Sequence, residues 1–134
     1  MTQVATRKTR LGAFVKMEEY EDRNAMRSVE TLTLAATAPE IGAVFNPADG
    51  ELLAAADVAG LTAGTSVLWL LVDDRIYDLY TGAGDYDLAV MLGGPGASLY
   101  AEVVRDQLKF ADALSGGQVD TVVAVLAAQG IKAV

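Results

Sequence analysis

Cysteine and histidine are both absent from this chain of 134 residues. Without cysteine there is no disulfide and no thiolate metal site. Without histidine the protein lacks the most common general base and the most common ligand of transition metals. The usual components of most small enzymes are therefore missing, and we expect no catalysis, no cofactor and no metal.

Long apolar runs are missing as well. The longest, "VLWLLV" (Val67 to Val72), is far too short to cross a bilayer. The basic start "MTQVATRKTR" is not followed by the apolar stretch of a signal peptide. We therefore expect synthesis in a cytoplasm and no membrane partner.

Charge is distributed unevenly. Residues 1–16 carry four basic side chains and no acidic one, whereas the remainder carries 6 basic and 18 acidic side chains, for a net charge of −8. An acidic body repels nucleic acid, so we expect no nucleic-acid partner. A short basic segment on such a body is either a solvated tail or a docking arm.

With 52% apolar and 21% charged residues, the chain is typical of one globular domain. We interpret residues 1–24 as an N-terminal arm and residues 25–134 as the domain. Within the domain, composition and alternation predict strands at 28–34, 41–45 and 65–72, and a hairpin over 75–92 ("RIYDLYTG" and "YDLAVML") with its turn at "GAGD". Helical spacing is present at 99–110 and is clearest at 119–128.

The C-terminal segment "LAAQGIKAV" predicts a capped helix followed by a docked tail. Gly130 occupies the C′ position, where a left-handed residue ends a helix. Ile131 and Leu126 would then form the apolar contact that accompanies such a cap.

A cluster of acidic and aromatic residues supports an alternative function. A small ligand-binding or hydrolytic domain would use the carboxylates and tyrosines around residues 73–87. Trp69 and the tyrosines also suit a sugar-stacking platform, although such residues more often belong to a core. The residues concerned are Asp73, Asp74, Tyr77, Asp78, Tyr80, Asp85, Tyr86, Asp87 and Tyr100.

"GGPG" (Gly93 to Gly96) follows a predicted strand and resembles a phosphate loop only superficially. No lysine follows at the Walker spacing, and Pro95 removes one N–H donor. We interpret Gly94 and Pro95 as a structural turn.

The arm contains "LGAFV" (Leu11 to Val15), an apolar β-capable stretch with basic residues on both sides. An exposed segment of this kind can add a strand to the open sheet edge of a partner. We expect Arg7, Lys8, Arg10, Leu11, Phe14 and Val15 to make the contacts, and residues 1–16 to be dispensable for folding. A flexible tail is the other interpretation.

Five motifs in order resemble the lambda-type bacteriophage head decoration family over about residues 27–134. They are an arginine before the first strand ("RSVETLTL"), a glycine-led short strand ("IGAVF"), and an apolar strand ending in acids ("LLVDD"). A strand ending in glycine-proline ("VMLGGPG") and an alanine-rich helix with terminal glycine-isoleucine ("LAAQGI") complete the set.

The resemblance implies a small β-rich α+β domain, barrel-like, with one or two short helices and an extended arm. It implies a structural virion protein that binds the outer surface of the expanded phage head as a homotrimer and stabilises the major capsid protein lattice. The arm would dock on the major capsid protein.

Overall fold

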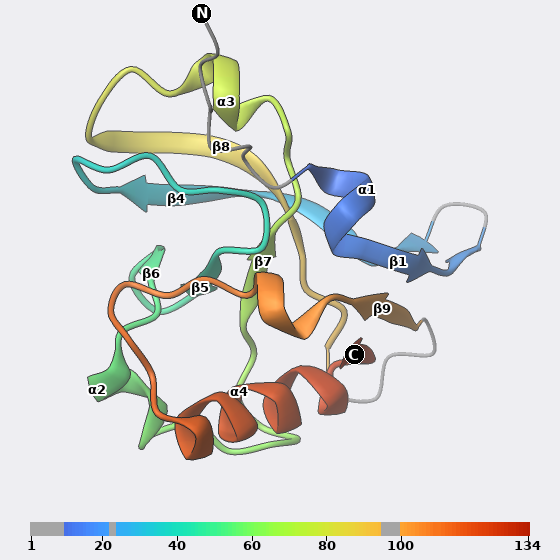
Figure 1. The fold of residues 1–134 in the computed structure, drawn as a ribbon. Helices are drawn as coiled ribbons and strands as arrows, with labels where there is room; N and C mark the ends of the chain where they lie inside the picture. The colour runs from blue at the N-terminus through green and yellow to red at the C-terminus, as the bar shows by residue number, and fades with distance from the viewer. Residues whose placement is uncertain (1–9, 22–23, 95–99) are drawn as a thin grey trace, which may run out of the picture.

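A curled five-stranded sheet organises the protein, which is a small β-rich domain of the α+β class as expected (Figure 1). The computed structural model describes residues 10–21, 24–94 and 100–134. The elements are α1 (Leu11–Phe14), β1 (Val15–Glu18), β2 (Tyr20–Glu21), β3 (Asn24–Ala25), β4 (Arg27–Leu34), β5 (Val44–Asn46), β6 (Glu51–Leu52), α2 (Ala55–Val58), β7 (Trp69–Leu71), α3 (Ile76–Leu79), β8 (Gly84–Met91), β9 (Ala101–Val103), a 3₁₀ turn (Arg105–Gln107), α4 (Gly116–Ala128) and β10 (Ile131–Ala133).

The large sheet has the order β4-β8-β7-β5-β6, and every neighbouring pair is antiparallel. Its longest pair, β4 with β8, is in register from Arg27↔Met91 to Leu34↔Gly84. The alternation in "SVETLTL" places Leu32 and Leu34 inside, and the apolar run before Val72 forms the central strand β7. The sheet curls until its two edges meet, where the Thr33 N–H of β4 donates to the Gly50 carbonyl (2.8 Å) in the turn that leads into β6.

A second sheet of three strands has the order β1-β9-β10. β1 pairs antiparallel with β9, and β10 pairs parallel with it. Val15 and Ala133 therefore lie on opposite sides of the same residue, Val103.

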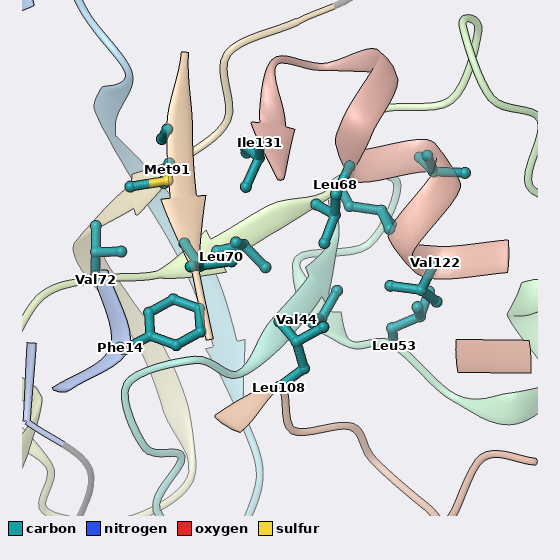
Figure 2. Close-up of a cluster of buried hydrophobic side chains, with 14 of the residues drawn as sticks. Phe14, Val44, Leu53, Leu68, Leu70, Val72, Met91, Leu108, Val122 and Ile131 are labelled. Carbon is teal, nitrogen blue, oxygen red and sulfur yellow. The ribbon is translucent and has the colours of Figure 1, made fainter. Parts of the chain in front are cut away.

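Helix α4 joins the two sheets through the core. Its N-cap, Ser115, accepts the Gln118 N–H, and the Gln118 side chain accepts the Ser115 N–H, which forms a capping box. Its buried face places Val122 in the same cluster as Leu53, Leu68 and Ile131 (Figure 2). No helix in the described ranges is long and apolar enough to cross a membrane.

Two predicted elements are wrong. The helical spacing at 99–110 corresponds to β9 and a 3₁₀ turn, because Ala101 and Val103 alternate into the core beside β10. The hairpin predicted over 75–92 is replaced by the single-turn helix α3 followed by β8, which pairs with β4 and β7 instead.

Candidate functional site

The expected exposed arm segment is instead part of the core. Phe14 is fully buried, and Figure 2 shows its ring facing the group that contains Val72, Leu70 and Met91. Leu11 and Val15 are half-buried and pack against the same cluster. The expectation that this stretch is exposed to a partner's sheet edge is therefore wrong for Phe14, whereas the division into an arm (1–24) and a domain (25–134) remains a prediction.

Gly42 makes room for this anchor. Its φ is +95°, and a Cβ there would lie 2.3 Å from the Gln107 carbonyl oxygen and 3.2 Å from the Phe14 ring. Only glycine permits both approaches. β1 then continues the anchor by pairing with β9, and the Phe14 carbonyl accepts the Val104 N–H (2.9 Å).

The basic residues of the arm fall outside this anchor. Arg10 is exposed and precedes α1, and its carbonyl accepts the N–H groups of Ala13 and Phe14. Arg7 and Lys8 lie outside the described residues. Of the six arm residues singled out from the sequence, the structure thus buries Phe14, half-buries two, leaves Arg10 exposed and does not describe the other two.

The residues singled out as structural lie at two adjoining turns. Gly130 has a φ of +87°, and its N–H donates to the Ala127 carbonyl, as the C′ position of a left-handed cap requires. Ile131 and Leu126 are both fully buried in one cluster. Gly94 donates its N–H to the Gln129 carbonyl (3.1 Å), whereas Pro95 lies outside the described residues.

The acidic residues around 73–87 do not converge. Asp85 and Asp87 accept the hydroxyls of Thr33 and Thr31 across the β4–β8 pair. Asp74 and Asp78 are exposed. In the part of the chain that the structure describes, no group of three or more acidic side chains is arranged to hold a metal ion.

Asp73 is buried and has a structural partner. Its carboxylate accepts from Arg75 Nη2 (2.6 Å) and Nε (2.9 Å), and from the Ala89 N–H (3.0 Å). The hydrogen bond from Arg75, followed by the backbone bonds, lowers the pKa of Asp73 to about 2. This carboxylate stays ionised at neutral pH and fixes the turn after β7 to β8.

The aromatic residues also serve the fold. Tyr80 and Tyr86 stack with ring centroids 5.8 Å apart, and their hydroxyls donate to the carbonyls of Ala35 and Gly82. Trp69 packs against the buried cluster inside the curled sheet. The predicted carboxylate and tyrosine site is thus dispersed over separate structural contacts.

Where the sheet opens, a groove of about 620 Å³ forms. It is lined by residues 33–35 at the end of β4, by the loop 37–40, by Glu51, Leu52 and Ala54 at β6, and by residues 109–111. β4 and β6 run in the same direction and meet at Thr33 and Gly50. Beyond that contact they separate, which leaves the groove between them.

Lys109 contributes a half-buried cation to this groove. Its ammonium donates to the carbonyls of Ile41 (2.9 Å) and Gln107 (3.0 Å). Burial lowers the pKa of Lys109, and the nearby Glu40 acts in the opposite direction. Glu40 and Glu51 are the acidic residues of the lining.

Sequence reasoning missed the groove and the buried amide of Gln129. This fully buried side chain accepts the Leu68 N–H (2.8 Å) and donates to the carbonyls of Leu68 and Leu92. It fixes the end of α4 to the sheet. Nothing local distinguishes this glutamine from an exposed one at a helix end.

Comparisons of the chain with protein-family models, with curated proteins and with solved structures find no match. The functional conclusions that follow are therefore drawn from the sequence motifs and from the geometry of the described residues.

Proposed function

We propose that this protein is a phage head decoration protein, which binds the outer surface of the expanded head and stabilises the major capsid protein lattice. In this role it is a structural component of the virion, made in the host cytoplasm and assembled as homotrimers. It needs no catalysis, because its effect is mass action: whatever binds only the expanded shell stabilises that state.

The observation that carries the proposal is how the basic N-terminal segment joins the acidic body. Residues 1–16 have a charge of +4, against −12 for the remainder. Phe14 packs in the core cluster and β1 pairs with β9, so the base of this segment is anchored to both sheets. A cationic segment with a rigid base suits an acidic surface on a large partner.

Four of the five motifs of the resemblance support the proposal because each coincides with an element or junction of one body, whereas "VMLGGPG" starts in β8 and continues beyond the described residues. "RSVETLTL" is β4, and "IGAVF" leads into β5. "LLVDD" contains the end of β7 and the Asp73 contact, and "LAAQGI" ends α4 at Gly130. Weak contacts between each copy of the protein and the shell, repeated over the whole shell, add up through avidity.

The test is co-sedimentation of the full chain with expanded, undecorated heads of the source phage. We expect saturable binding that stabilises the heads to heat, and at least a tenfold loss of affinity in the Arg7→Glu/Lys8→Glu variant. The matched control uses single substitutions: Lys132→Glu, at an exposed lysine outside residues 1–16, changes the net charge as much as Arg7→Glu does and should leave binding unchanged. Absence of saturable co-sedimentation by the unmodified chain would discard the proposal.

A further inference from the structure

The groove between β4 and β6 is bordered on one side by an open strand edge. The Leu53 N–H of the chain after β6 donates to the Val44 carbonyl, so the Phe45↔Leu52 pair is of the non-hydrogen-bonded kind. The Leu52 N–H and C=O therefore point away from β5. Neither group has a partner among the described residues, so both are available to a further strand.

β4 borders the groove on the other side with a second open edge. The Leu92 N–H donates to the Met26 carbonyl, and hydrogen-bonded pairs between β4 and β8 follow from there at every second residue. Thr33 lies between two such residues and therefore points away from β8. Its N–H donates to the Gly50 carbonyl, whereas its C=O has no partner among the described residues. An extended chain between β4 and β6 would thus find backbone groups on both sides.

Apolar side chains form much of the groove lining. Leu34 and Ala43 are buried there, and Leu52 and Phe110 are half-buried. Successive side chains of a strand point to opposite faces, so an added strand would direct every second side chain toward this apolar lining. Small or β-branched side chains suit those positions, and the main-chain hydrogen bonds would supply affinity as in β-augmentation.

Exposed carboxylates follow the β6 side of the groove. Glu51 is an exposed residue of the lining. Asp49 and Asp112 are exposed beside it in the chain and beside lining residue 111, and their carboxylates accept the N–H groups of Glu51 and Ala55. These three carboxylates favour a ligand whose remaining side chains are cationic.

We propose that the groove between β4 and β6 binds an extended cationic segment of a partner protein, which adds a strand beside Leu52 and continues the sheet. In the bound segment, small or β-branched side chains face the apolar lining, and the lysines or arginines between them face Glu51 and its acidic neighbours. Every described strand of this chain is already paired within it, so a second copy has no described strand to donate. This contact goes beyond the decoration role and uses none of the basic residues of the N-terminal segment.

The test is an NMR titration of the ¹⁵N-labelled full chain with a synthetic peptide of four Lys-Val repeats, blocked at both ends. We expect saturable shifts of the amide signals of residues 33–35 and 51–54, and hydrogen exchange of the Leu52 amide slowed at least tenfold at saturation. A peptide of four Glu-Val repeats should bind at least tenfold more weakly. The Lys-Val peptide with its backbone amides N-methylated should give no protection of Leu52, because it cannot pair as a strand.

A pair of variants tests the electrostatic part. Glu51→Lys should weaken binding of the Lys-Val peptide at least fivefold. Asp74→Lys changes the net charge equally at an exposed residue outside the lining, and should leave binding unchanged.

Three results would overturn the proposal. The first is no saturable shift with millimolar Lys-Val peptide, and the second is equal binding of the basic and acidic peptides. The third is a Leu52 amide already protected without peptide. Protection at every protein concentration would assign the groove to the same chain, and protection that grows with concentration would assign it to a second copy. The measurement uses no heads, so its failure is distinct from failure of the decoration role.

Discussion

Among single residues, Asp73 gives the clearest pH dependence. Its pKa is lowered to about 2 in the folded protein, against 3.8 ordinarily, so the unfolded chain takes up a proton first as the pH falls. The stabilisation, about 2 kcal/mol from the size of that shift, is therefore complete above about pH 4 and is lost as the pH falls to about 2.

Substituting Asp73→Asn should accordingly lower the free energy of unfolding by about 2 kcal/mol at pH 7. Urea unfolding followed by circular dichroism between pH 7 and pH 2 measures the difference. We expect the difference in the free energy of unfolding between the unmodified protein and the Asp73→Asn variant to become smaller below pH 4. The exposed neighbour Asp74→Asn serves as the control, and a gap independent of pH would assign the effect of Asp73 to packing alone.

Gly130 is the second residue with a sharp consequence. At a φ of +87° a β-branched side chain is strained, so Gly130→Val should cost about 2 kcal/mol and lower the melting temperature. The control is Gly116→Ala, since Gly116 has ordinary backbone geometry and open space around its Cβ position. Equal melting temperatures for Gly130→Val and the unmodified chain would contradict the left-handed cap.

Among the elements, α1 and β1 determine where the N-terminal region can be truncated without loss of stability, because both pack with the core. Removing residues 1–9 leaves Phe14 and β1 in place, so we expect the melting temperature to stay within a few degrees. Removing residues 1–16 deletes Phe14 from the core, which should cost about 3–5 kcal/mol, as should Phe14→Ala.

Thermal unfolding of the three variants checks this expectation, with Met17→Ala as the control because Met17 is 40% exposed on β1. A chain lacking residues 1–16 that melts like the unmodified one would show that α1 and β1 are not part of the core. In that case, deleting residues 1–16 would test docking without disturbing the fold. The burial of Phe14 indicates instead that this deletion also destabilises the domain.

Elements with strong local patterns were predictable from sequence. Alternation predicted β4, a bounded apolar run predicted β7, and a broad apolar face with a terminal glycine predicted α4 from Val119 onward; its first turn, from Gly116, was not predicted. The segments 76–79 and 101–103 were assigned the wrong type, because each is short and takes its structure from its neighbours. Ile76 is held by the sheet below α3, and Ala101 by β10, thirty residues later in the chain.

For the molecule as a whole, the groove was beyond sequence reasoning for a related reason. It exists only because β4 and β6 meet at Thr33 and Gly50 and then separate, and Lys109 reaches it from a third region. The burial of Phe14 was not predicted, because nothing near this isolated aromatic residue in the sequence indicates that the distant Gly42 makes space for its ring. Charge asymmetry, by contrast, was evident from the composition.

The pairing of Val15 and Ala133 with the two sides of Val103 has a topological consequence. Two strand spacings separate these residues, about 10 Å, and β1 and β10 run in opposite directions, so a linker of a few residues can join Val134 to Arg10. The two ends of the domain are therefore close enough to be joined without rearranging either sheet. A circular permutant joined there and opened at the exposed turn near Gly64 would keep both sheets while moving the chain ends to the far side of the fold.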